Sequence, residues 1–161
     1  MQTRYVGVLL AVRDVETSKA FYRDVFGQTA ALDLGWNVTF SGGFMLQQNF
    51  AWLTDVPEKS VVQQSHNAEL YFETDDFDAF WEKISTRKDI RLVHEPRKHE
   101  WQQRVVRIYD PDGHMIEIGE AMDVIVRRCL AEGCSIEETA EIIHHPVSFV
   151  ESCVRAENRR K

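Results

Sequence analysis

The chain has 161 residues, of which 43% are hydrophobic and 28% are charged, and this composition excludes an intrinsically disordered chain. Its formal net charge of −7 disfavours binding to nucleic acid or to an anionic membrane surface, so we expect small molecules as ligands. The sequence has neither the basic and apolar stretches of a signal peptide nor an apolar run near the roughly 20 residues that span a bilayer. We therefore expect a cytoplasmic protein without a membrane partner.

The first half of the chain opens with a strand and an amphipathic helix. Residues 5–12 are a continuous run rich in valine and leucine, which is typical of a strand covered on both faces. Asp14 can cap the following helix, the apolar residues of segment 16–26 recur at three- and four-residue spacings, and Gly27 can end the helix. The β-type runs that follow are residues 37–40 and 44–50.

The same order returns in the second half. Residues 69–74 predict a strand, Asp76 predicts a helix cap, and the apolar residues of segment 77–84 fall on one helical face. Aligning Asp14 with Asp76 gives an offset of 76 − 14 = 62 residues, which places Gly7 opposite Glu69. The two halves therefore look like copies of one βαβββ unit. The β-type runs of the second copy are residues 90–93, 104–109 and 114–119.

A turn and a longer connector separate these runs. Residues 110–113 read Asp-Pro-Asp-Gly and predict a tight hairpin, because proline fixes φ at the first turn position and glycine accepts a positive φ at the end. Residues 51–67 are mostly polar and include a proline, so they are the expected connector between the two units.

After the second unit the pattern changes to three short helices. Residues 122–130 are amphipathic and Gly133 ends them, Ser135 opens a capping box for a helix that reaches about residue 143, and Pro146 suits the start of a third helix. We expect these helices to form a small trihelical unit.

Two functions of this trihelical unit are disfavoured. It resembles a DNA-reading fold, but its reading region, residues 147–153, contains Glu151 and no basic residue, so we expect no nucleic acid partner. The cysteine and histidine spacings match no compact zinc motif, and we expect free thiols. The cysteines are Cys129, Cys134 and Cys153.

Two motifs at the ends of the internal repeat carry a family resemblance. They are VRDVETSKAFYRDVFG at residues 12–27 and YDPDGHMIEIGE at residues 109–120. Together they resemble the vicinal oxygen chelate superfamily, which includes glyoxalases, bleomycin-resistance proteins and extradiol dioxygenases. The resemblance implies an α+β fold in which two βαβββ modules form an open cup-shaped barrel around one pocket, and it implies a homodimer.

The expected domain organisation follows from this resemblance. A glyoxalase-like domain covers residues 1–120, with modules at about residues 5–55 and 67–120. Residues 121–161 form the C-terminal trihelical appendage.

The resemblance also implies a metal site, from which this sequence departs. The four positions that hold a divalent ion in metal-using relatives fall at Gly7, Gln47, Glu69 and Glu117. Gly7 stands where the family often has histidine, and Glu69 replaces a second histidine. Glu117 and Glu69, with Gln47, could bind a divalent metal ion of unknown identity and act as catalytic groups; alternatively, the pocket holds no metal.

Strand alternation independently places the two carboxylates. Met115 and Glu117 share one strand face while the neighbouring isoleucines share the other, and by the same parity Glu69 shares a face with Tyr71. Two carboxylates in one partly dry cavity raise each other's pKa unless a cation or a basic residue neutralises them. The candidate basic neighbours are Arg104, Arg107 and His99.

Aromatic side chains near this predicted pocket favour a flat ligand. Trp81 falls on the apolar helical stripe and is assigned to the core, whereas Trp52 and Trp101 lie in or beside loops. The segment 94–104, which contains Trp101, is interpreted as a pocket rim or a solvated connector. The residues predicted to bind the ligand are Gln47, Tyr71, Trp101, Met115, Trp52 and Arg104.

Two functions remain open at this stage. In the first, the chain is a glyoxalase-like enzyme, a lyase or isomerase in which a metal or a carboxylate promotes proton abstraction beside a carbonyl. In the second, it is a metal-free protein that sequesters a flat aromatic toxin or antibiotic, as bleomycin-resistance proteins do.

Overall fold

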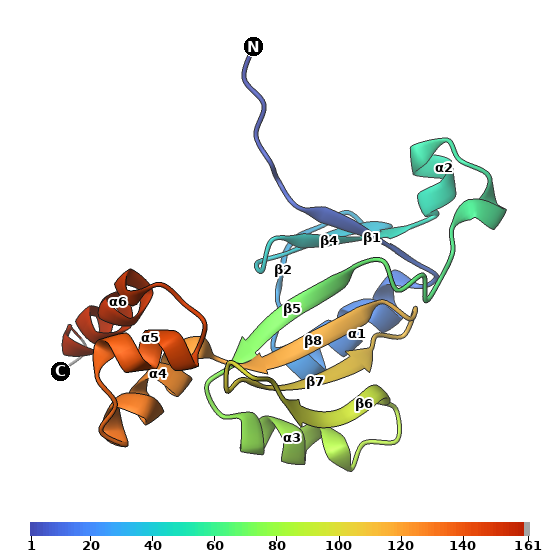
Figure 1. Ribbon diagram of the computed structural model, residues 1–161. Helices are drawn as coiled ribbons and strands as arrows, with labels where there is room; N and C mark the ends of the chain where they lie inside the picture. The colour runs from blue at the N-terminus through green and yellow to red at the C-terminus, as the bar shows by residue number, and fades with distance from the viewer. Residues whose placement is uncertain (160–161) are drawn as a thin grey trace. The chain divides into compact units, whose positions relative to one another are not determined.

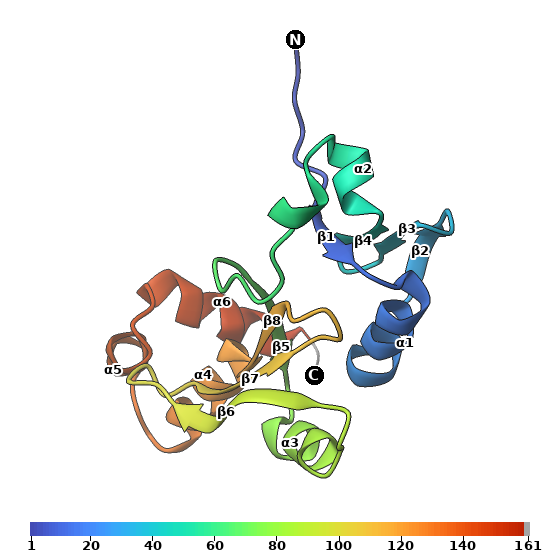
Figure 2. The ribbon, with the colours of Figure 1, turned by 90° about the vertical axis from the view of Figure 1, so that its right-hand side faces the viewer.

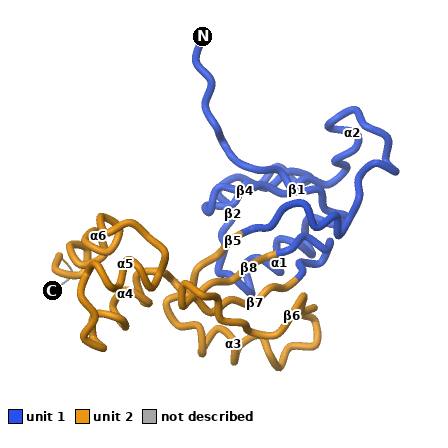
Figure 3. The backbone as a smooth tube through the Cα atoms, in the orientation of Figure 1, with its two compact units in different colours: residues 1–70, 109–115 blue, residues 71–108, 116–161 orange. Residues whose placement is uncertain are grey.

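A computed structural model describes residues 1–159 of the protein, and Figure 3 shows its two compact units. One unit comprises residues 1–70 and 109–115, and the other comprises residues 71–108 and the chain from residue 116 onward. No helix among residues 1–159 is long and apolar enough to cross a membrane.

The first unit contains one complete βαβββ module (Figure 1). Its sheet has the strand order β1-β4-β3-β2, in which β1 runs parallel to β4 and the other neighbours are antiparallel. The elements are β1 (Val8–Val12), α1 (Val15–Phe26), β2 (Ala30–Asp33), β3 (Asn37–Phe40) and β4 (Phe44–Gln48). The predicted module is confirmed, and β2 is a strand that the sequence pattern did not indicate.

Helix α1 forms where its caps predict it. The Asp14 side chain accepts a hydrogen bond from Thr17 N at 2.7 Å, and Gly27 ends the helix with a φ of 64°. Its buried face packs on the sheet through Tyr22, whose ring centroid lies 5.6 Å from that of Phe40 and 4.9 Å from that of Phe44. Aromatic packing of this kind fixes the helix against the sheet.

The connector after β4 is partly ordered. It contains a short helix α2 (Phe50–Thr54) and a 3₁₀ turn η1 (Glu58–Ser60), both grouped with the first unit.

The second unit contains the second βαβββ module, seen from another side in Figure 2. Its sheet has the order β5-β8-β7-β6, and α3 lies along one face. Asp76 caps α3 by accepting a hydrogen bond from Ala79 N at 2.9 Å, as predicted. The elements are β5 (Glu69–Thr74), α3 (Phe77–Ser85), β6 (Arg91–Lys98), β7 (Arg104–Tyr109) and β8 (Met115–Glu120).

Three helices follow β8 and share one apolar core. They are α4 (Met122–Ala131), α5 (Ile136–Ile142) and α6 (Val147–Asn158), and α5 begins with the predicted capping box between Ser135 and Glu138. Ile125, Ile143 and Val150 are fully buried between them. These helices belong to the same compact unit as the second module. The α+β fold with two βαβββ modules and a trihelical segment is thus confirmed, while the domain boundary after Glu120 stays a prediction.

Candidate functional site

The second sheet has a face opposite α3, which we call the Glu117 face. Along β8, Ile116 and Ile118 are buried with exposures of 0% and 1%, and alternation directs Glu117 to the other side of the strand. There Glu117 forms an ion pair with Arg107, and Arg107 Nη1 lies 3.3 Å from His94 Nε2. The carboxylate predicted as a metal ligand is therefore neutralised by a guanidinium.

A chain of hydrogen bonds fixes two aromatic rings on the same face. Trp101 Nε1 donates to Gln103 Oε1 at 3.0 Å, and Gln103 Nε2 donates to the Tyr71 hydroxyl at 2.7 Å. The Tyr71 hydroxyl in turn donates to Glu73 Oε1 at 2.9 Å. A Cβ on Gly119 would lie 2.6 Å from Gln103 Nε2, so the glycine leaves the space that this chain needs.

The pKa shifts of His99 and Tyr71 favour the neutral forms of both side chains. His99 stacks on Trp101 with ring centroids 4.1 Å apart and planes 10° apart. Partial burial, and then the charges of Arg107 and His94, lower the pKa of His99, which favours its neutral form. Burial raises the pKa of Tyr71 to about 12 against the opposing hydrogen bond from Gln103, so its hydroxyl is a donor rather than a base.

Arg104, predicted to bind a ligand, lies on the opposite, α3-covered face. Its guanidinium contacts Asp78 at 2.8 Å and Glu120 at 3.0 Å, and it lies 4.9 Å from the centre of the Phe77 ring. Arg128 from α4 contacts the same Glu120 carboxylate at 2.7 Å. Burial alone would raise the pKa of Glu120, but hydrogen bonds from the two arginines outweigh burial and lower it. This cluster joins the second sheet to α4, and a ligand-binding role for Arg104 stays a prediction.

Gln47 and Gly7, two of the implied metal positions, lie in the first unit. Gln47 is 4% exposed, its Oε1 accepts from Asn37 Nδ2 at 2.9 Å and its Nε2 donates to the Gln48 carbonyl at 2.6 Å. A Cβ on Gly7 would lie 2.4 Å from the Gly43 carbonyl oxygen. A histidine therefore cannot be accommodated at Gly7 without a shift of the backbone.

The other predicted residues are spread over several elements. Trp52 is 74% exposed on α2, Glu69 is exposed at the start of β5, and Met115 is half-buried at the start of β8. Of the predicted site residues, the structure brings together Tyr71, Trp101 and Glu117. It adds Gln103 and His94, which sequence reasoning missed, although Gln103 has the same strand parity as Arg107.

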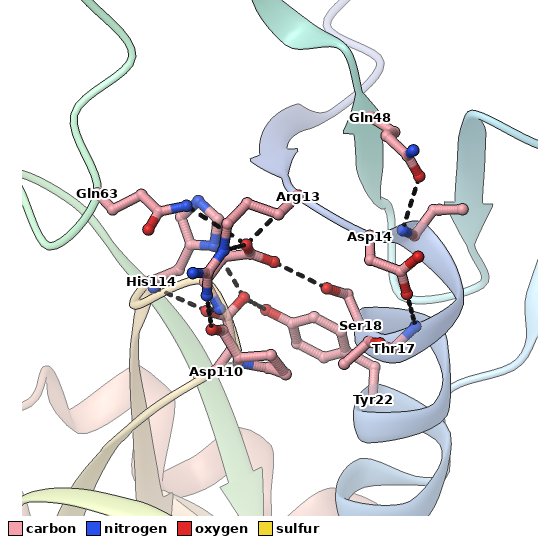
Figure 4. A network of polar contacts seen from close by, with 12 residues as sticks. Arg13, Asp14, Thr17, Ser18, Tyr22, Gln48, Gln63, Asp110 and His114 are labelled. Carbon is pink, nitrogen blue, oxygen red and sulfur yellow. Dashed lines mark hydrogen bonds and ion pairs between the residues drawn. The ribbon is translucent and has the colours of Figure 1, made fainter. Parts of the chain in front are cut away.

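The predicted hairpin at residues 110–113 holds a separate polar network in the first unit (Figure 4). Asp110 and Asp112 are 3% and 4% exposed. The Tyr22 hydroxyl donates to Asp110 at 2.9 Å, and the Ser18 hydroxyl donates to Asp112 at 2.9 Å. Both hydroxyls come from α1, so the network ties the hairpin to that helix.

His114 completes this network. Its Nδ1 lies 2.8 Å from Asp110 Oδ2. Burial alone would lower the pKa of His114, but the hydrogen bond to Asp110 and the charges of Asp110 and Asp112 outweigh burial and raise it. The network is a structural clamp that contains a titratable group.

The side chains at the implied metal positions do not fit a divalent cation well. Glu117 is paired with Arg107, both polar atoms of the Gln47 side chain have protein partners, and Gly7 supplies no ligand. No group of three or more histidine, cysteine, aspartate or glutamate residues within residues 1–159 is arranged to hold a metal ion. The implied positions thus lack the histidine ligands that zinc, nickel and iron sites commonly include.

Comparisons with known proteins agree with this fold. A family model described as a glyoxalase-like domain matches residues 5–123. A metallothiol transferase, FosB, from Lysinibacillus sphaericus is 28% identical over 115 residues, which cover 68% of this chain and 77% of the relative. FosB of Bacillus licheniformis is also 28% identical over 115 residues, covering 69% of this chain and 71% of that protein.

Solved structures share the fold as well. A protein of unknown function from Agrobacterium tumefaciens is 36% identical, with a TM-score of 0.65, over 75% of this chain and 96% of that chain. A glyoxalase/bleomycin resistance protein/dioxygenase family enzyme from Burkholderia phytofirmans has a TM-score of 0.63 at 16% identity, over 73% of this chain and 98% of that chain.

Proposed function

Because the chain belongs to the glyoxalase-like domain family of the vicinal oxygen chelate superfamily, we propose that it binds a small, flat organic molecule on the Glu117 face without a metal ion. The observation that carries this proposal is the ion pair between Glu117 and Arg107, which balances the carboxylate that a cation would otherwise balance. The ligand-binding or metal-binding roles of Gln47, Glu69, Trp52 and Met115 stay predictions from the sequence.

The flat ligand follows from the rings on this face. His99 stacks on Trp101, the Tyr71 side chain is 50% exposed, and hydrogen bonds through Gln103 hold Trp101 and Tyr71 in fixed orientations. Rings that are ordered before binding lose little conformational entropy when a ligand stacks on them. The polar atoms nearby would select the orientation of the ligand.

A second candidate function is metal-dependent chemistry. The relatives named metallothiol transferase favour it, because their name refers to a metal. In that case Glu117 would hold a divalent cation in place of its ion pair with Arg107, and the cation would supply Lewis-acid activation of the substrate.

Metal content and ligand affinity measured together distinguish the two candidates. We expect purified protein to hold less than stoichiometric zinc, manganese or nickel, and its affinity for planar aromatic probes such as anilinonaphthalene sulfonate to be unchanged by a chelator. Trp101→Leu should weaken probe binding about fivefold, since one aromatic contact contributes about 1 kcal/mol. Trp36→Leu is the matched control, because Trp36 is a 58% exposed tryptophan of the first unit.

Other outcomes would contradict the proposal. Stoichiometric metal that is lost in Glu117→Gln would establish the metal-dependent candidate. Equal weakening of probe binding by Trp101→Leu and Trp36→Leu would remove the Glu117 face as the binding surface.

A further inference from the structure

The turn between α4 and α5 brings two thiols together. The backbone N–H of Cys134 donates to the Cys129 carbonyl at 3.1 Å, the N–H of Gly133 donates to the Leu130 carbonyl at 3.1 Å, and Gly133 has a φ of 98°. These are the paired bonds of a Schellman motif, in which the side chains in the positions of Cys129 and Cys134 commonly contact each other. The sequence alone predicts only that both cysteines are free thiols.

A cavity gives small molecules access to this pair. Its volume is about 300 Å³, and both cysteines line it. A second cavity of about 360 Å³ is also lined by Cys134. The remaining residues of the first cavity are Lys98, Gln102, Arg128, Glu132 and Ile142.

The two thiols differ in accessibility. Cys129 is 6% exposed, whereas Cys134 is only half-buried. Burial, and then the proximity of Cys134 and Glu132, raise the pKa of Cys129. An incoming reagent therefore meets Cys134 first, and Cys129 lies behind it.

We propose that Cys129 and Cys134 form a thiol–disulfide exchange site for a low-molecular-weight disulfide that carries carboxylates. The chemical class is that of oxidised glutathione. The proposal is independent of the ligand proposed for the Glu117 face.

The exchange proceeds in two balanced steps. The Cys134 thiolate attacks one sulfur of the small disulfide, forms a mixed disulfide and expels one small thiolate. The Cys129 thiolate then attacks the Cys134 sulfur, closes the protein disulfide and expels the second small thiolate. The two protons lost by the cysteines are taken up by the two small thiolates, so two protein thiols are oxidised and one small disulfide is reduced.

The wall of the first cavity carries two cations against one carboxylate, Glu132, so a carboxylate on the reagent meets a net positive charge there. It contains the Lys98 ammonium and the Arg128 guanidinium, and both cations also act on Cys129, where they partly offset the effect of burial on its pKa. The Arg128 guanidinium already forms an ion pair with Glu120. We therefore expect the Lys98 ammonium to be the cation that contacts a carboxylate of the ligand.

Mass spectrometry of the folded, full-length protein tests the proposal. After incubation with oxidised glutathione and alkylation of the remaining thiols, wild-type protein should carry a Cys129–Cys134 disulfide. Cys129→Ser should stop at one glutathione on Cys134. Cys134→Ser should react at least about tenfold more slowly, because only the buried thiol of the pair is left.

Matched controls make the result decisive. Cys153→Ser, which removes the thiol on α6, should behave as the wild type. Lys98→Gln should slow the reaction with oxidised glutathione about threefold and leave the reaction with cystamine, a cationic disulfide, no slower than before. Circular dichroism confirms that each variant is folded.

Three results would overturn the proposal. They are preferential modification of Cys153, no reaction of the folded wild type at Cys134, and accumulation of the mixed disulfide in the wild type without closure. An equal effect of Lys98→Gln on both reagents would overturn the role of the carboxylates.

Discussion

At the scale of single residues, the buried carboxylates are each matched to a named donor or cation. Asp110 and Asp112 meet hydroxyls of α1, Glu117 meets Arg107, and Glu120 meets two arginines. An uncompensated charge in a protein interior costs several kcal/mol, so these partners decide whether the buried charges can be tolerated. Removing a partner should therefore cost more than the pair itself contributes.

His114 makes this balance depend on pH. The pKa of His114 is raised in the folded protein, so its stabilising contribution is fully present below the unfolded pKa and is lost as the pH rises through the folded pKa. We expect His114→Asn to lower the free energy of unfolding by about 1–3 kcal/mol near pH 5.5, with the difference from wild type shrinking toward about pH 9.

Urea denaturation over this pH range measures the effect. His144→Asn is the control, because His144 is exposed and has a φ of 55°, which asparagine tolerates. If the free energies of unfolding of wild type and His114→Asn differ by the same amount at every pH, the charge of His114 does not contribute to stability.

At the scale of elements, local signals determine much of the fold. Caps and apolar spacing place α1, α3 and α5, and alternation places β7 and β8. Strand β2 is fully exposed and depends on pairing with β3, so no pattern in its own residues marks it. Strand β6 continues through Pro96, which is compatible with its position at the edge of the sheet.

The contacts within the site were predictable only in part. Alternation gives the face on which Glu117 lies, but it leaves Arg104, Arg107 and His99 as possible partners. Arg104 and Arg107 are three residues apart on β7 and so point to opposite faces, and only the packing of α3 shows which face is which. Gln103 precedes the strand, where the periodicity ends.

Glu120 joins the second sheet to α4 through its ion pairs with Arg104 and Arg128. We expect Glu120→Gln to lower the free energy of unfolding by about 1.5–3 kcal/mol, because two partly exposed guanidinium groups lose a buried charged partner. The pKa of Glu120 is lowered on folding, so its contribution is present above the unfolded pKa and is lost as the pH falls through the folded pKa.

Chemical denaturation near neutral pH provides the measurement. Glu82→Gln on the exposed side of α3 should change stability by less than about 0.5 kcal/mol. Equal effects of the two substitutions would contradict a bridging role for Glu120.

At the scale of the whole molecule, apolar side chains on the first unit remain uncovered within one chain. Trp52 is 74% exposed, Leu34 and Val62 are each 66% exposed, and Tyr5 is 83% exposed. Such groups mark an interaction surface where they form one contiguous patch. The homodimer that the family resemblance implies stays a prediction.

Sedimentation velocity should find a dimer at tens of micromolar protein. Trp52→Glu should shift the distribution toward monomer by at least about tenfold in the dissociation constant, since a charge replaces a large apolar contact. A wild-type protein that sediments only as monomer at that concentration would contradict the prediction.

Trp101 links two parts of the second unit. Its indole stacks on His99, donates to Gln103 on the Glu117 face, and also packs against the apolar core of the three C-terminal helices. The fluorescence of this one side chain therefore depends on both surroundings. In a chain whose other tryptophans are replaced, the fluorescence emission of Trp101 would report ligand binding on the Glu117 face. The same emission would report unfolding of the three C-terminal helices.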